Sequence, residues 1–258
     1  MRRFLAVWIA VTLCGAFAAA GAERGESGLT RFLLSRWGEM SPQTWEVVRE
    51  DDGWWFREND GWRFQEDESA PRPLPADLAA ELEQIVADYD MRSWDGVYSN
   101  EYEVLDGDCF SLEMEFADGA AVSASGDNAF PEGYFEAMDA VDEFLERARL
   151  AALAGTYRYE GEGFGGDFTI TLSADGTYTF SEGPLSSYAG MGEWAVDFGA
   201  VRMVEGETGF DLSFRFGVEA DALIYLADGS DAFPGVSLSD GARFIRLDEA
   251  KDGAPTGE

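Results

Sequence analysis

The spacing of apolar residues along the chain predicts two domains of different architecture. Residues 29–149 combine alternating runs, typical of strands, with two stretches whose apolar residues recur every three to four positions, typical of helices. Residues 151–248 contain only the strand pattern, with Gly, Asp and Ser between the runs. We therefore expect an α+β domain, an antiparallel sheet with two helices, followed by an all-β antiparallel domain.

The two helices of the first domain are expected after proline-containing segments. The first should begin at Pro75 and end near Asp90, and the second should follow Pro131. The apolar stripes are Leu78, Leu82, Ile85 and Tyr89 on the first helix and Tyr134, Met138, Val141, Leu145 and Ala148 on the second. The opposite face of the second helix is acidic, so we expect each stripe to lie on the sheet.

A hairpin between the helices has a turn whose length can be deduced from side-chain parity. A two-residue turn at Asp118-Gly119 would place Glu113 and Glu115 on the face of Val122. A three-residue turn, Ala117-Asp118-Gly119 with Gly119 left-handed, pairs Met114 with Val122 and separates apolar from acidic residues. We therefore predict the three-residue turn.

The second domain should contain about eight antiparallel strands joined by short connections. The expected strands span residues 156–160, 167–173, 177–182, 191–197, 201–204, 210–216, 222–226 and 242–247. A turn at Ala174-Asp175-Gly176 pairs Leu172 with Tyr178 by the same parity. So many short strands imply a small closed barrel or a sandwich, because closure removes exposed strand edges.

Both halves resemble known kinds of domain. The second half resembles lipocalin-like barrels, whose first strand opens with Gly-x-Trp and whose last strand carries an Arg. The matching residues here are Gly155-Thr156-Tyr157 on the first strand and Arg243 or Arg246 on the last. Tyr157 stands where that pattern has Trp, and Gly-x-Trp itself occurs at Gly192-Glu193-Trp194. This resemblance implies a β-barrel with a cavity for an apolar ligand. The first half, with Trp94-Asp95-Gly96, Leu105-Asp106-Gly107 and Asn128-Ala129-Phe130-Pro131, resembles exported bacterial domains with no assigned activity.

The N-terminal residues 1–22 have the pattern of a secretory signal peptide. Arg2 and Arg3 precede an apolar run that ends in small residues. Leu13 precedes Cys14, where a lipoprotein signal has a small residue, so we expect no lipid anchor. The protein is thus expected to be exported to the cell envelope or the extracellular space, without stable membrane insertion after cleavage. Residues 249–258 are expected to form a disordered tail.

Charge and composition exclude several functions. The chain has 51 Asp and Glu against 18 Lys and Arg, a net charge of −33, which repels nucleic acids. It has no His, so imidazole-based triads and His-ligated metal sites are excluded.

Cys109 would be the only cysteine after signal cleavage, and we expect a small buried hydrophobe rather than a nucleophile. Asp88, Asp90 and Asp95 miss the calcium-loop spacing, so we expect neither metal nor cofactor.

Aromatic residues remain the best candidates for ligand contacts. We select Trp54 and Trp62 in the first domain and Tyr157 and Trp194 in the second as ligand-binding candidates, and we assign no catalytic residue. The expected function is non-enzymatic binding or interaction, with a small apolar ligand in the barrel or a glycan or protein as partner. The alternative is a carboxylate-dependent hydrolase acting on an extracellular glycan, since two acids suffice for that chemistry.

Overall fold

The structure is a computed structural model that describes most of the two expected domains. The described residues are 28–37, 42–59, 70–100, 107–161, 168–183, 188–197, 199–206, 212–219 and 221–247. The expected signal peptide (1–22), Trp62 and the expected tail (249–258) lie outside the described residues.

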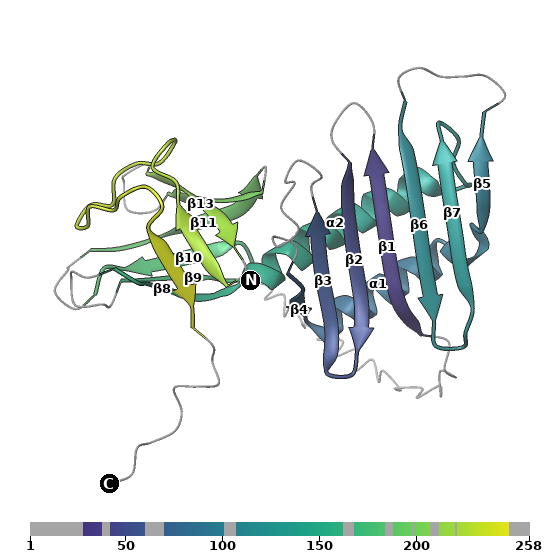
Figure 1. The fold of residues 1–258 in the computed structure, drawn as a ribbon, viewed down its shortest axis with the longest axis horizontal. Helices are drawn as coiled ribbons and strands as arrows, with labels where there is room; N and C mark the ends of the chain where they lie inside the picture. Colours follow the sequence, from purple (N-terminus) through teal and green to yellow (C-terminus); the bar gives the residue numbers. More distant parts are fainter. Residues whose placement is uncertain are drawn as a thin grey trace, which may run out of the picture.

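The first domain is a seven-stranded sheet with two helices on one face (Figure 1). The strand order is β4-β3-β2-β1-β6-β7-β5. The strands are β1 Leu29–Trp37, β2 Gln43–Glu50, β3 Gly53–Asn59, β4 Arg72–Leu74, β5 Gly96–Ser99, β6 Cys109–Phe116 and β7 Ala121–Asp127. The helices are α1 Ala76–Asp88, the short 3-10 helix η1 Met91–Ser93 and α2 Tyr134–Leu153. The prediction of a sheet with two helices is confirmed.

One edge of the sheet differs from the expected antiparallel arrangement, because β5 runs parallel to β7. The cause is the pairing of β6, which has β1 on one side and β7 on the other. β5 can therefore reach only the outer edge of β7. The chain reverses once between β5 and β6 and again in the β6–β7 hairpin, so β7 returns in the direction of β5. The expectation of a purely antiparallel sheet was wrong at this edge.

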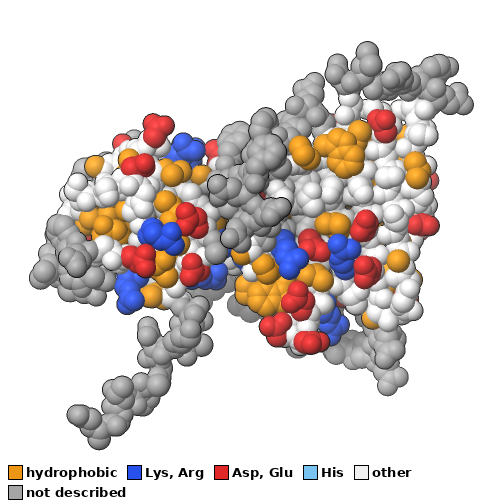
Figure 2. Space-filling model, viewed as in Figure 1, with side chains coloured by type: hydrophobic (Ala, Val, Ile, Leu, Met, Phe, Trp, Pro, Cys, Tyr) orange, Lys and Arg blue, Asp and Glu red, His pale blue; other side chains and the backbone are white. Residues whose placement is uncertain are grey.

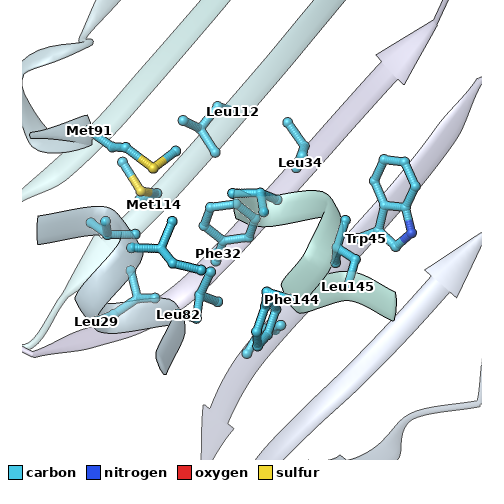
Figure 3. Packing of buried hydrophobic residues seen from close by; sticks show 14 of the residues in the cluster. Leu29, Phe32, Leu34, Trp45, Leu82, Met91, Leu112, Met114, Phe144 and Leu145 are labelled. Carbon is cyan, nitrogen blue, oxygen red and sulfur yellow. The ribbon is translucent and has the colours of Figure 1, made fainter. Parts of the chain in front are cut away.

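The core of the first domain lies between the sheet and the helices (Figure 3). Phe32 of β1 is paired with Val47 of β2 and Met114 of β6, and all three are buried on the helix side. Leu82 of α1 and Leu145 of α2 pack against them. Each such side chain contributes about 1.5–3 kcal/mol by leaving water. The predicted α2 stripe is buried throughout: Tyr134, Met138, Val141, Leu145 and Ala148.

The hairpin turn at Ala117-Asp118-Gly119 has the predicted three-residue form. Met114 is paired with Val122, and the amide of Phe116 donates a hydrogen bond to the carbonyl of Ala120 (3.0 Å). Gly119 is left-handed, with φ 82°, whereas Asp118 is not among the residues with positive φ. Parity alone therefore predicted the register correctly, because the alternative would have placed glutamates in the core.

The second domain is a closed barrel of eight antiparallel strands, as predicted. Around the barrel the order is β10-β11-β12-β13-β14-β15-β8-β9. The strands are β8 Gly155–Tyr159, β9 Thr169–Leu172, β10 Thr177–Ser181, β11 Ala189–Asp197, β12 Ala200–Glu205, β13 Ser213–Glu219, β14 Ala222–Tyr225 and β15 Arg243–Arg246. Leu172 is paired with Tyr178, which confirms the turn predicted at residues 174–176.

Helix α2 connects the two domains as one continuous element (Figure 1). Ala152, near its end, belongs to the core of the first domain, and Leu153 belongs to the core of the barrel. The sheet edge also approaches the barrel, since Arg72 of β4 interacts electrostatically with Tyr157 and Arg246. The last turn of α2 therefore covers one end of the barrel.

Candidate functional site

The two ends of the barrel differ in how they are closed. At one end the Tyr157 hydroxyl donates a hydrogen bond to the carbonyl of Leu153 (2.7 Å), and Leu150 packs against the same core. The tight turn at residues 173–176 completes this end, where Trp194 donates from Nε1 to the carbonyl of Ser173 (2.9 Å). The opposite end carries the connections β8–β9, β10–β11, β12–β13 and β14–β15. We call this second end the mouth.

The mouth is filled by Phe233, a residue of the β14–β15 connection rather than of a strand. Phe233 is 4% exposed, and its ring stacks on that of Phe214 with centroids 3.9 Å apart and planes 9° apart. Its other aromatic neighbours are Phe168, Phe180, Phe216 and Tyr225. A loop residue thus supplies part of the barrel core.

The connection that carries Phe233 is attached firmly at its start. The amide of Ser213 donates a hydrogen bond to Asp231 Oδ2 (2.8 Å), and the amide of Asp231 donates to the carbonyl of Ser213 (2.8 Å). Beyond this point the amide of Gly235 donates to Glu182 Oε1 (2.9 Å). A Cβ at position 235 would lie 1.9 Å from Glu182 Oε2, so glycine permits this approach. We call residues 232–236 the plug segment.

A small polar cluster lies inside the otherwise apolar barrel. Glu205 of β12 is fully buried, and Oε1 accepts a hydrogen bond from the Tyr188 hydroxyl (2.6 Å). Tyr178 of β10 is 1% exposed. In register, Tyr178 is opposite Gly192 of β11, and Gly192 is opposite Glu205. Gly192 has no side chain, and β12 approaches so closely there that a Cβ would lie 2.0 Å from the carbonyl oxygen of Val204 and 3.0 Å from the Cα of Glu205. We call Tyr178, Tyr188 and Glu205 the inner polar cluster.

The hydroxyl of Tyr178 is buried and has no hydrogen-bond partner among the described residues. Burial raises the pKa of Tyr178 well above its usual range, and the electrostatic interaction with nearby Glu205 raises it further. The phenol therefore stays protonated at neutral pH. An unpaired buried hydroxyl is costly, so this group needs an explanation.

Of the ligand-binding candidates selected from the sequence, Tyr157 and Trp194 lie at one end of the barrel and Trp54 lies in the first domain. Tyr157 and Trp194 are buried at the end sealed by α2, and their polar atoms bond to the chain's own carbonyls. Trp54 is half-buried in the first domain and packs against its core. Trp62 lies outside the described residues.

Sequence reasoning missed Phe233 and Glu182 at the mouth and the inner polar cluster on the adjoining inner wall. A signal for Glu205 was present, since it continues the inward parity of Val201 and Met203. A glutamate at a core position is unusual enough to mark it. Phe233 lacks any periodic context, so its inward position was not predictable from alternation.

The open face of the first sheet carries acidic and basic side chains beside exposed apolar ones such as Trp37 (Figure 2). On this face Glu46 accepts from Arg31 Nε and Arg57 Nη1, both at 2.9 Å. Cys109 also lies here and is half-buried, with its thiol 3.5 Å from Asp127 Oδ1. The expectation of a buried Cys109 was wrong, because Phe110 takes the core-facing position.

The described residues contain no group of three or more Cys, Asp or Glu side chains placed to hold a metal ion. No helix among them is long and apolar enough to cross a membrane.

Comparisons with known proteins add no relative to this picture. No protein-family model, no curated protein and no solved structure matches the chain.

Proposed function

We propose that this is an exported, non-enzymatic binding protein whose barrel receives a small ligand with an apolar, ring-sized body at the mouth. The observation that carries the proposal is Phe233, which enters the barrel from a connection and occupies the space between five aromatic side chains. A ligand ring that takes this place recovers the same contacts. Arg246, paired with Tyr157 and lying over Gly155, supports the proposal that the barrel is lipocalin-like.

The plug segment can be displaced at modest cost. Within residues 232–236 only Phe233 is an aromatic, and Ala232, Pro234 and Gly235 are exposed. Phe233 and Val236 provide the apolar anchors, and the Gly235 amide provides a hydrogen bond to Glu182. Removing one Phe side chain from a core costs about 1.5–3 kcal/mol in transfer free energy.

The alternative of a carboxylate-dependent hydrolase has weaker support. Glu182 is 1% exposed and Glu205 is 0% exposed, so both are buried acids at the same end of the barrel. A glycosidase needs both carboxyl groups to face a substrate in an accessible cleft. Here each one accepts a hydrogen bond from the protein in a filled interior. The arrangement is better suited to binding than to hydrolysis.

The test is binding of a neutral ring-sized probe, 2-phenylethanol, to the full exported chain. We expect chemical-shift changes by NMR that are confined to the barrel mouth, and tighter binding to Phe233→Ala, which vacates the ring position. Phe135→Ala is the matched control, because Phe135 is 63% exposed in the first domain. Absence of binding to both the natural chain and Phe233→Ala would overturn the proposal and leave the barrel as a solid structural core.

A further inference from the structure

The walls of the barrel mouth combine aromatic faces with buried acids. Phe180 lies 5.1 Å from Phe233 and 5.7 Å from Tyr188, measured between ring centroids. Glu182 follows Phe180 along the chain and is anchored to the plug segment. Glu205 of β12 accepts a hydrogen bond from the Tyr188 hydroxyl. Aromatic faces and carboxylates both attract cations, and each does so more strongly away from water.

The backbone of β11 makes room for this arrangement. A Cβ at Gly190 would lie 2.2 Å from the Phe180 ring, so that ring lies over Gly190. One step along the same strand, Gly192 stands in register between Tyr178 and Glu205 and lets the backbone of β12 approach closely. The two glycines thus admit the Phe180 ring at one position and the backbone of β12 at the other, and Tyr178 lies near enough to Glu205 to interact with it electrostatically.

The unpartnered Tyr178 hydroxyl is the second, independent indication of a ligand. The hydroxyl is buried inside the barrel, on the side of Glu205, and no described residue pairs with it. A phenylalanine at this position would fill the same volume without the cost of an unpaired polar group. The hydroxyl is explained if a ligand donor pairs with its oxygen when the site is occupied.

We infer that the ligand is an organic cation, with an aromatic body in place of the Phe233 ring and an ammonium head group held by Glu205 and the Tyr178 oxygen. This inference rests on the proposed function and specifies its ligand class. An ammonium has donors for both oxygens, whereas a carboxylate ligand would meet two buried acids of its own sign. The net charge of −33 also enriches cations and repels anions around the protein.

The experiment compares three probes with one ring and different head groups. They are 2-phenylethylamine, 2-phenylethanol and 3-phenylpropanoate, titrated calorimetrically into the full exported chain and into Phe233→Ala at about 0.15 M salt, which screens surface charge. We expect the amine to bind at least about tenfold more tightly than the alcohol, and the carboxylate more weakly than either.

Substitutions then locate the charge that the head group contacts. Glu205→Gln keeps the shape and the acceptor for Tyr188, and should reduce the amine-to-alcohol preference to less than about threefold. Glu193→Gln removes an exposed charge on β11 and should leave the preference intact. Tyr178→Phe, which preserves the packing, should weaken the amine more than the alcohol.

The outcomes separate the two proposals. If the alcohol binds and the amine has no advantage, the ligand-class inference is wrong and the proposed function stands. If Glu205→Gln still binds the amine more tightly than the alcohol by the same factor, a different acid interacts with the ammonium group and the inference is also overturned. If none of the three probes binds either chain, the proposed function fails together with it.

Discussion

Arg246, on the last strand of the barrel, donates a hydrogen bond from Nη1 to the carbonyl of Ala152, on the last turn of the helix that begins in the first domain (3.0 Å). Nη2 donates to the carbonyl of Ala154 (2.5 Å). The guanidinium thus satisfies carbonyls that the helix itself leaves unpaired and places positive charge at the negative end of the helix dipole.

Arg246→Met should therefore destabilise the protein by about 1.5–3 kcal/mol, the range for hydrogen bonds that involve a charged group. Arg243→Met is the control on the same strand. Arg243 points outward and pairs with the exposed Glu160 and Glu219, so its loss should cost less than about 1 kcal/mol. Urea unfolding followed by circular dichroism measures both. Equal costs for the two variants would show that Arg246 does not anchor the helix end.

Tyr178→Phe should stabilise the ligand-free protein by about 1 kcal/mol, because it removes an unpaired buried hydroxyl while the ring remains. Tyr188→Phe provides the opposite case. It breaks the 2.6 Å hydrogen bond to Glu205 and should cost about 1.5–3 kcal/mol. Thermal unfolding without ligand measures the pair. A lower melting temperature for Tyr178→Phe would mean that its hydroxyl already has a partner in the folded state.

Gly192→Ala should be far more costly than an ordinary Gly-to-Ala change. The added Cβ would lie 2.0 Å from the carbonyl oxygen of Val204, a backbone atom that cannot move aside without distorting β12. Strain of this kind costs about 1–3 kcal/mol. Gly206→Ala, with nothing within 4 Å of its added Cβ, should change stability by less than about 0.5 kcal/mol. Denaturant midpoints compare the two, and similar midpoints would contradict the close strand approach at Gly192.

Alkaline pH should destabilise the fold through its buried tyrosines. Burial raises the pKa of Tyr134 to about 12, mainly by desolvation. In the unfolded chain the tyrosine ionises near pH 10, about two units earlier. The stabilisation is therefore complete below about pH 10 and is lost as the pH rises towards 12, an effect of about 2–3 kcal/mol for this residue.

The alkaline prediction is checked by unfolding free energies at a series of pH values between 9 and 12, together with tyrosinate absorbance. Tyr134→Phe should flatten part of the decline, since it removes one ionisable group from the core of the first domain. A free energy of unfolding that stays constant across this interval would show that the buried tyrosines have normal pKa values.

Much of the fold was predictable because the alternation of apolar and polar residues along a strand indicates which face of the strand is buried. Placing Met114 opposite Val122, and Leu172 opposite Tyr178, required only that acidic residues face water. The eight strands of the barrel followed from their punctuation by turn residues. The parallel edge strand β5 was not predictable, since its direction depends on which edges of the sheet remain unpaired.

The mouth was not predictable for a different physical reason. Phe233 belongs to a connection rich in Gly, Asp and Ser, and local pattern does not say which loop residue turns inward. The closeness of Tyr178 and Glu205 depends on register across three strands and on the missing side chain at Gly192. Such closeness arises only from the closed sheet.

The seal formed by α2 also limits how anything can move through the barrel. Leu153 and the Tyr157 hydroxyl close the end opposite Phe233. In the proposed function, a ligand that enters past the plug segment therefore meets a closed end and leaves by the same route. Such a barrel would hold and release a ligand at one end rather than conduct it from one side to the other.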